Sequence, residues 1–419
     1  MDGITMEYGL IGENLEHSFS KSLHEDYLNT KYELISLKKE ELKDFFIKKE
    51  FKGINVTIPY KKEVISYLDE VDPLVKRIGS CNCIINNNGK LKGYNTDYYG
   101  FKFLLEENEV SIENKNIAVL GSGGTYKTIK AVLEDLNANN IYCISRNKKD
   151  DNYTYEELLS LKVDIIINTT PIGMYPNNYV NNIDLDKIEN LELVIDVIFN
   201  PLRTKLLIDA KRKNIKTIGG LQMLVAQGIK SSELFLNKNY TLEEIRSCYF
   251  DLWVDKSNIV LIGMPMSGKS TIGHKLKEAF NKEFIDIDKE IVDKENKTIN
   301  EIFEIYGEDY FRKLENELYT EYSKKNGLII STGGGIVKNI DSIYKLKQNG
   351  LVVFIDRKIE KMIINNHRPL SKTKEDIERL YKERYELYLN NSDVKINNNG
   401  SKKRAVINIV EAFYENISH

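Results

Sequence analysis

The sequence predicts an α/β protein with largely parallel sheets. Apolar, strand-like runs recur between amphipathic helical segments, and two glycine-rich turns each follow such a run and open a helix. The length of 419 residues exceeds what one ordinary core supports and suits two or three domains. Asn-rich stretches at residues 86–89 and 397–400 are expected as turns between strands and helices. Strands are expected at residues 8–11, 53–57, 117–120, 141–145, 164–168, 193–197, 259–262, 284–287, 328–331 and 352–355.

The composition excludes several classes of partner. A net charge of -3, with acidic and basic residues both abundant, gives no reason to expect nucleic acid or a membrane surface. The amino terminus lacks the features of a signal peptide and no apolar run approaches a membrane span, so a cytoplasmic protein is expected. Its partners are expected to be small molecules, and the protein is expected to be a monomer or a homodimer. The cysteines are too few and too scattered for a disulfide framework: Cys81, Cys83, Cys143 and Cys248.

A complete phosphate-binding loop, GMPMSGKS, occupies residues 263–270. It lies between a predicted strand and a predicted helix, which is the context that such a loop requires. Backbone N–H groups of the turn cradle phosphates, Lys269 reaches the terminal phosphates, and the Ser270 hydroxyl ligates Mg²⁺. The candidate ATP contacts are Gly263, Gly268, Lys269, Ser270 and Thr271.

Two carboxylates follow the next predicted strand. Asp286 and Asp288 occupy alternate positions at its end, so we expect both side chains on one face. One can serve the Mg²⁺ shell, and the other can accept the proton of a substrate hydroxyl.

A second nucleotide-binding turn, GSGG at residues 121–124, follows the predicted strand 116–120. Gly121, Gly123 and Gly124 fit a dinucleotide-binding turn, although a plain tight turn is an equally open alternative. The next strand ends near Arg146, where an NAD enzyme would present a carboxylate and an NADP enzyme a cation. Arg146, with Lys127 or Lys148 nearby, therefore indicates NADP, and solvated loop charges are the alternative.

Segments on both sides of this turn resemble shikimate dehydrogenase, in the order typical of that family. They are GLIG and HSFS within residues 9–20, NVTIPYK at 55–61, GSCN at 79–82, GYNTD at 93–97, NTTPIGM at 168–174, DVIFNP at 196–201 and GLQMLVAQ at 220–227. The resemblance implies a substrate-binding domain over residues 1–105. It implies a Rossmann NADP domain over residues 106–256, whose last helices return to the substrate domain.

The same resemblance implies roles for individual residues. Lys61 and Asp97 would form the catalytic pair, because reducing a ketone leaves an alkoxide that a lysine held by a carboxylate can protonate. A surface lysine and a helix N-cap are the alternatives for these two residues. The other implied contacts are substrate-binding Ser18, Ser20, Thr57, Asn82 and Gln227, and cofactor-binding Met223.

Two residues depart from the pattern of that family. Tyr126 stands where the cofactor turn usually has alanine or serine, and we expect its bulk to disturb the packing of the helix on the strand. Phe199 replaces a tyrosine that usually precedes an Asn-Pro pair, which removes a hydroxyl.

From residue 257 onward the chain resembles shikimate kinase. The resemblance is carried by the phosphate loop, GEDYFRKLE at 307–315, STGGG at 331–335, RPL at 368–370, and Arg384 with Tyr388. It implies a P-loop kinase domain with a parallel sheet over residues 257–419. Helix-face charges are the alternative for the two helical arginines. The implied roles are shikimate binding by Asp288, Arg312, Gly333, Gly334 and Arg384, action through Mg²⁺-bound water by Asp286, and closure over the transferring phosphate by Arg368.

Together the two resemblances predict a bifunctional enzyme of the pathway to chorismate, the precursor of the aromatic amino acids. The first half would reduce 3-dehydroshikimate to shikimate with NADPH, and the second would phosphorylate shikimate with MgATP. Two alternatives stay open: use of quinate or NAD by the first half, and a degenerate, regulatory nucleotide-binding role for one half.

Met266 replaces a usual glycine or alanine in the phosphate loop, and we expect it to be tolerated.

Overall fold

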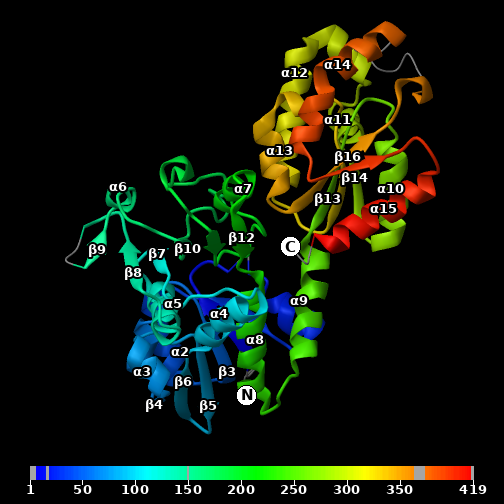
Figure 1. The fold of residues 1–419 in the computed structure, drawn as a ribbon. Helices are drawn as coiled ribbons and strands as arrows, with labels where there is room; N and C mark the ends of the chain where they lie inside the picture. Colours follow the sequence, from blue (N-terminus) through cyan, green and yellow to red (C-terminus); the bar gives the residue numbers. More distant parts are fainter. Residues whose placement is uncertain (1–5, 16–17, 149–150, 363–372, 417–419) are drawn as a thin grey trace. The chain divides into compact units, whose positions relative to one another are not determined.

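The computed structural model describes residues 6–15, 18–148, 151–362 and 373–416. The chain divides into two compact units, Met1–Leu252 and Trp253–His419, and each is described by itself. Figure 1 labels the elements of both. None of the helices in the described ranges combines the length and the apolar character that crossing a membrane requires.

The first sheet of the first unit is mixed, with strand order β2-β1-β3-β5-β6-β4. β5 pairs antiparallel with both β3 and β6. Every other strand pair in the described part of the chain is parallel, so the largely parallel arrangement is confirmed and β5 is its exception. The strands are β1 (Met6–Gly12), β2 (Glu33–Ser36), β3 (Phe51–Val56), β4 (Glu70–Val71), β5 (Cys83–Asn87) and β6 (Lys90–Tyr94).

The reversal at β5 comes from a tight hairpin. Asn88 and Gly89 connect β5 to β6 with φ angles of 53° and 88°. An Asn-Gly pair adopts this left-handed backbone at low cost in a two-residue hairpin turn. The predicted turn between a strand and a helix is therefore wrong here, and the Asn-Gly pair is the signal that identifies a hairpin.

The second sheet has six parallel strands in the order β12-β11-β10-β7-β8-β9. In chain order, β7, β8 and β9 extend toward one edge of the sheet, and β10, β11 and β12 extend from β7 toward the other edge. This is the doubly wound order of dinucleotide-binding folds, which place their ligand at the reversal between β7 and β10. The strands are β7 (Asn116–Leu120), β8 (Asn140–Ile144), β9 (Asn152–Tyr153), β10 (Ile165–Asn168), β11 (Leu193–Asp196) and β12 (Lys216–Gly219).

Helices cover both faces of the second sheet. One hydrophobic cluster includes residues of α4, α5 and α8, and the other includes residues of α6 and α7. α8 crosses α4 at Gly100, where an added Cβ would lie 2.6 Å from the Met223 carbonyl oxygen, so the close crossing requires glycine. The helices of this unit are α1 (Ser20–Ser22), α2 (Leu42–Lys48), α3 (Pro73–Ile78), α4 (Thr96–Glu107), α5 (Gly124–Asp135), α6 (Tyr155–Leu158), α7 (Lys205–Arg212), α8 (Leu221–Leu236) and α9 (Leu242–Lys256), the last of which crosses into the second unit.

The second unit contains one parallel sheet in the order β14-β15-β13-β16-β17. One hydrophobic cluster joins the sheet to α11, α12, α13 and α14, and a second joins its other face to α10 and α15 (Figure 1). The strands are β13 (Asn258–Ile262), β14 (Glu283–Asp286), β15 (Leu328–Ser331), β16 (Gly350–Asp356) and β17 (Val394–Asn397). The helices are α10 (Lys269–Phe280), α11 (Ile287–Glu295), α12 (Ile299–Tyr322, kinked at Gly307), α13 (Ile340–Lys347), α14 (Lys374–Asn391) and α15 (Lys402–Glu415).

Each predicted strand overlaps an observed strand, and most of the strands that were not predicted share a position in their sheets. Apart from the β5–β6 hairpin, they lie at sheet edges: β2, β4, β9, β12 and β17. An edge strand is short and half-exposed, so it lacks the apolar run by which a buried strand is detected.

Asp196 ends β11 as a fully buried carboxyl, with an exposed fraction of 0%. It accepts hydrogen bonds from the Asn168 side chain (3.1 Å), the Ile198 N–H (3.1 Å) and the Thr204 hydroxyl (2.6 Å). Burial raises the pKa of Asp196 to about 6, and these hydrogen bonds offset only part of that rise. The folded protein therefore keeps a proton that the unfolded chain releases near pH 4.

We expect Asp196→Asn to change how stability depends on pH. The folded state binds more protons than the unfolded state between about pH 4 and pH 6, so this carboxyl's contribution is full below that window and is lost as the pH rises through it. Asparagine keeps the size but does not titrate, which removes a dependence of about 3 kcal/mol at most. Urea unfolding of both proteins at several pH values, followed by circular dichroism, measures it. A pH-independent difference between them would contradict the raised pKa.

Candidate active sites

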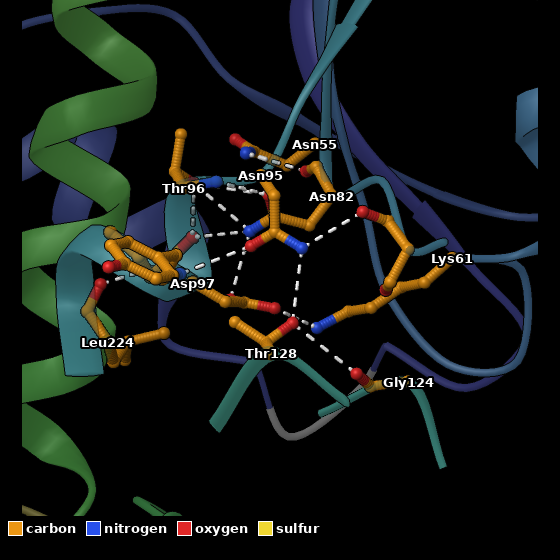
Figure 2. A network of polar contacts seen from close by, with 12 residues as sticks. Asn55, Lys61, Asn82, Asn95, Thr96, Asp97, Gly124, Thr128 and Leu224 are labelled. Atoms are coloured by element: carbon orange, nitrogen blue, oxygen red, sulfur yellow. Dashed lines mark hydrogen bonds and ion pairs between the residues drawn. The ribbon is translucent and has the colours of Figure 1, made fainter. Parts of the chain in front are cut away.

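Lys61 and Asp97 form an ion pair in the first unit. Lys61 lies in the turn after β3, four residues beyond Thr57, and Asp97 lies in the first turn of α4. The Lys61 Nζ lies 2.6 Å from the Asp97 Oδ2, and the two side chains are 15% and 8% exposed. Figure 2 shows this pair among the polar side chains around it. A lysine held by a carboxylate at a mostly buried site is positioned to donate a proton.

Asn82 holds the Asp97 carboxylate from the other side. Its Nδ2 donates to the Asp97 Oδ1 (2.9 Å), and its Oδ1 accepts from the Thr96 N–H (2.7 Å). The N-cap of α4 is Asn95, whose side chain accepts from the Tyr98 N–H. The alternative in which Asp97 is the helix N-cap is therefore wrong.

A buried polar network continues behind Asn82 (Figure 2). The Asn82 Nδ2 also lies 3.5 Å from the Gln227 Oε1 on α8, and the Thr96 hydroxyl lies 3.0 Å from the Ser231 hydroxyl. Asn55 on β3 donates to the Ser231 Oγ (2.7 Å) and to the Asn82 carbonyl (3.1 Å). These bonds restrain the Asn82 side chain. Asn55, Thr96 and Ser231 were not predicted from the sequence, although a serine on the apolar face of α8 is a usable signal.

Ser18 and Ser20 lie at the start of α1, where the Ser18 Oγ accepts from the Ser20 N–H (3.2 Å). Between them, the Phe19 ring contacts the Phe199 ring, with centroids 5.5 Å apart. Within the described residues, no hydrogen bond joins either serine to the lysine–aspartate pair. The structure thus brings Asn82 and Gln227 to the pair but leaves the two serines without a direct link to it.

The glycine turn 121–124 lies next to Lys61. Gly121 has a φ of 103°, and Gly123 caps α5, which begins at Gly124. A Cβ on Gly124 would lie 3.1 Å from the Ser80 Oγ and 3.7 Å from the Lys61 Cβ. The N-terminus of α5, where a dinucleotide pyrophosphate binds in such folds, is therefore adjacent to the candidate proton donor.

The predicted cofactor residues occupy different environments. Arg146 is exposed in the turn after β8. Burial lowers the pKa of Lys127, in the first turn of α5, and the neighbouring charge of Lys62 lowers it further. Met223 is 6% exposed within the core cluster of α4, α5 and α8. Tyr126 packs half-buried against the same cluster, so α5 accommodates its ring.

The phosphate loop of the second unit connects β13 to α10. Gly263 and Gly268 have φ angles of 146° and 98°. Lys269 is 6% exposed, and its Nζ donates to the carbonyls of Gly263 (2.9 Å) and Met264 (3.0 Å). Met266 has a φ of 64°, a left-handed conformation that costs a non-glycine residue roughly 1–2 kcal/mol. The tolerance expected at Met266 therefore includes this backbone cost and stays a prediction.

Ser270, in the first turn of α10, contacts Asp286 at the end of β14. The Ser270 hydroxyl donates to the Asp286 Oδ2 (2.5 Å), and the Asp286 Oδ1 accepts from the Asp288 N–H (3.2 Å). A hydroxyl beside a carboxylate supplies the hard oxygen ligands that Mg²⁺ prefers. Asp286 ends β14 and caps α11, so Asp288 lies on the helix. The predicted placement of both carboxylates on one strand face is therefore wrong.

Asp288 lies beside the glycine turn after β15. A Cβ on Gly333 would lie 3.3 Å from the Asp288 Oδ1 and would clash with the Glu315 Oε1. Arg312 on α12 donates to Glu315 (2.5 Å) and to Glu308 (2.8 Å). Burial raises the pKa of Glu315, which is 2% exposed, and Arg312 offsets part of that rise. Glu315 was not predicted as a site residue, although its spacing of three residues from Arg312 on a helix indicates a pair.

Arg384 and Tyr388 on α14 both donate hydrogen bonds to Gly334, the residue after Gly333. The Arg384 Nη1 and the Tyr388 hydroxyl donate to the Gly334 carbonyl at 2.7 and 2.5 Å. Arg384 is 2% exposed, so the alternative of a solvated helix-face charge is wrong for it. A Cβ on Gly334 would lie 2.7 Å from the Pro265 Cδ, which places this turn against the phosphate loop. Arg368 lies outside the described residues.

Comparisons with known proteins match both units. The family model of the shikimate dehydrogenase substrate binding domain matches residues 10–84, and that of shikimate kinase matches residues 265–414. The NADP(+) shikimate dehydrogenase of Clostridium beijerinckii is 42% identical over 245 residues, which cover 54% of this chain and 91% of that relative. Shikimate dehydrogenase 1 from Peptoclostridium difficile is similar in structure, with a TM-score of 0.55 and 34% identity over 59% of this chain and 97% of the other. A shikimate dehydrogenase solved in complex with NADP+ has a TM-score of 0.52 and 35% identity, and the match covers 59% of this chain and 96% of that chain.

Proposed function

Because the N-terminal part of the chain belongs to the shikimate dehydrogenase family and residues 265–414 form a shikimate kinase domain, we propose that the protein catalyses two consecutive reactions. The first reduces 3-dehydroshikimate to shikimate with NADPH. The second phosphorylates the 3-hydroxyl of shikimate with MgATP. The observation that carries the proposal is chemical continuity, since the product of the first half is the acceptor of the second.

Lys61 is the proposed proton donor of the reduction. Negative charge develops on the ketone oxygen as it is reduced, and the ammonium group stabilises this charge and then donates a proton. Asp97 accepts hydrogen bonds from both Lys61 and Asn82, so it orients the ammonium toward the substrate. We assign the substrate hydroxyls to Thr57, Asn82 and Gln227, and its carboxylate to Ser18 and Ser20, following the resemblance.

NADPH, when bound, supplies the hydride. The open glycine turn fits its pyrophosphate, because a Cβ on Gly123 would meet nothing within 4 Å and the turn caps a helix N-terminus. Arg146, exposed at the end of β8, fits the 2′-phosphate, and Lys127 lies on the same edge of the sheet. The NADP named for the relatives agrees with this assignment.

In the second half, Lys269 leaves the Gly263 and Met264 carbonyls to bind the terminal phosphates. Ser270 and Asp286 would hold Mg²⁺, which when bound neutralises phosphate charge. Asp288 accepts the proton of the attacking hydroxyl and orients it.

Arg312 and Arg384 are the proposed ligands of the shikimate carboxylate. The guanidinium of Arg312 already contacts buried Glu315 and more exposed Glu308, so the substrate must replace Glu308. A partner that is 43% exposed is released at low cost.

One mixture tests both reactions. Purified protein is incubated with 3-dehydroshikimate, NADPH and MgATP, NADPH loss is followed by absorbance, and the product is identified by mass. We expect shikimate 3-phosphate. Accumulation of unphosphorylated shikimate would refute the kinase. In a parallel mixture, consumption of NADPH with 3-dehydroquinate but not with 3-dehydroshikimate would refute the assigned substrate of the first half.

The cofactor assignment predicts the behaviour of Arg146→Asp. Removing the cation that pairs with the 2′-phosphate should lower kcat/KM with NADPH by about tenfold or more and leave NADH use little changed. Lys162→Asp changes the net charge equally at an exposed position of the same unit and serves as the control. A parent enzyme equally efficient with both cofactors would rule the assignment out.

A further inference from the structure

The Asn95 side chain connects three segments of the first unit next to the proposed proton donor (Figure 2). Its Oδ1 accepts from the Tyr98 N–H (3.1 Å) and caps α4. Its Nδ2 donates to the Ser80 carbonyl (2.9 Å), in the turn before β5, and to the Thr128 hydroxyl (3.1 Å), on α5. Both N–H groups of the amide are thus used, and Asn95 holds α4, this turn and α5 together.

These contacts lead to Lys61 on one side and to Gly124 on the other. Cys81, the residue after the accepting carbonyl, donates its N–H to the Lys61 carbonyl (2.7 Å). The Thr128 hydroxyl donates to the Gly124 carbonyl (3.3 Å), one helical turn earlier. Gly124 itself lies against Lys61, because a Cβ there would lie 3.7 Å from the Lys61 Cβ. The contacts therefore form a closed ring that contains both the start of α5 and the proposed proton donor.

The ring is shielded from water. Ser80 and Thr128 are 0% exposed, and Asn95 is 6% exposed. A hydrogen bond in such a buried place is electrostatically stronger than one in water. Packing alone would be served at residue 128 by valine, which has nearly the shape of threonine and no hydroxyl to desolvate. The Thr128 hydroxyl therefore fixes the position of α5 rather than filling space.

A second tie holds the opposite end of α5. The Tyr98 hydroxyl donates to the Asp135 Oδ2 (2.6 Å), and the Arg77 Nη1 donates to the same oxygen (2.8 Å). Asp135 is the last residue of α5, so this tie lies roughly 16 Å along the helix from Gly124. Both ties join α5 to α4, and the first of them lies beside Lys61.

We infer that Thr128, acting through Asn95, is a positioning residue of the reduction, because it fixes the start of α5 relative to Lys61. This inference rests on the proposed reductase function. The ketone carbon receives hydride from NADPH and its oxygen receives a proton from Lys61, which yields the alcohol and NADP+. The two donors must therefore reach neighbouring atoms of one substrate. Since the cofactor pyrophosphate is assigned to the start of α5, a displaced α5 would carry the hydride donor away from Lys61.

Hydrogen–deuterium exchange of the protein without cofactor tests the tie itself. In Thr128→Val the backbone amides at the start of α5 should exchange about fivefold faster than in the parent, because this end of the helix has lost its anchor to Asn95. Thr128→Ser keeps the hydroxyl and should exchange like the parent. Tyr98→Phe, the matched control, removes the hydroxyl of the second tie and should leave these amides at the parent rate. Parent-like exchange in Thr128→Val would overturn the tie.

A single turnover measures the consequence for the reaction. The full chain with stoichiometric NADPH is mixed with 3-dehydroshikimate, and NADPH absorbance is followed by stopped flow. Thr128→Val should lower the rate constant of the fast phase by about tenfold and leave its amplitude at the parent value. Thr128→Ser should restore most of the rate.

The other outcomes of this measurement contradict the inference in distinct ways. A lower amplitude at the parent rate constant would show misfolded molecules instead of a displaced helix. An equal loss of rate in Tyr98→Phe would show that any anchor of α5 suffices. A parent protein that oxidises no NADPH with 3-dehydroshikimate would refute the proposed reduction, whereas a reactive parent beside an unaffected Thr128→Val would refute this inference alone.

Discussion

Replacing Lys61 by methionine should lower the turnover of 3-dehydroshikimate by about 10²–10⁴-fold, the usual contribution of a positioned general acid. Methionine fills a similar volume, but it cannot protonate the developing alkoxide or pair with Asp97. The loss should appear mainly in kcat, because the groups assigned to the substrate hydroxyls remain. Stopped-flow measurement of NADPH oxidation under saturating substrate gives this value.

Two controls separate catalysis from folding. Lys76→Met, at an exposed position on α3, should leave the reduction unchanged. Phosphorylation of added shikimate by Lys61→Met should stay near the parent rate, because the kinase residues lie in the other compact unit. Loss of both activities would indicate a folding defect. Full reduction by Lys61→Met would show that another group donates the proton.

Asp288→Asn should lower shikimate phosphorylation by roughly 10²–10⁴-fold. The amide has the same shape but cannot accept the hydroxyl proton, and it presents an NH₂ donor where an anionic acceptor is needed. Because Lys269 and Ser270 are unchanged, nucleotide binding should persist. The coupled mixture should then accumulate shikimate, which mass analysis of the products detects.

The matched control is Asp293→Asn, an exposed carboxylate farther along the same helix. It should phosphorylate shikimate at the parent rate. If Asp288→Asn does so as well, Asp288 is an ordinary residue of the first turn of α11, and the acceptor site lies elsewhere.

Much of the fold follows from local patterns. Buried central strands such as β13 carry continuous apolar runs, and the glycine turns after β7 and β13 mark where we propose that each sheet binds a nucleotide. Five edge strands, β2, β4, β9, β12 and β17, and the β5–β6 hairpin were not predicted. These strands are short and are held by pairing with a neighbouring strand, so a continuous apolar run does not mark them.

The candidate sites divide in the same way. Motif order predicted that Lys61 and Asp97 act together, yet neither residue is distinguishable alone from a surface lysine or a helix cap. The place of Glu315 beside the acceptor residues was not predicted, because it depends on its closeness to Gly333, a residue of another element. Asp288 was placed on a strand because the N-cap conformation of Asp286 was not recognised.

The sequence by itself determined the α/β class and the two glycine turns, because these depend on periodicity and on spacing within one βα unit, whereas the reacting groups were predicted only through the resemblance to two families. Only the tertiary structure decided which groups meet: Lys61 with Asp97 and Asn82, Ser270 with Asp286, and Arg384 with Gly334. The physical reason is that the hydrophobic core determines how strands are ordered in a sheet. That order brings residues far apart in the chain to one sheet edge, where hydrogen bonds and charge select their partners.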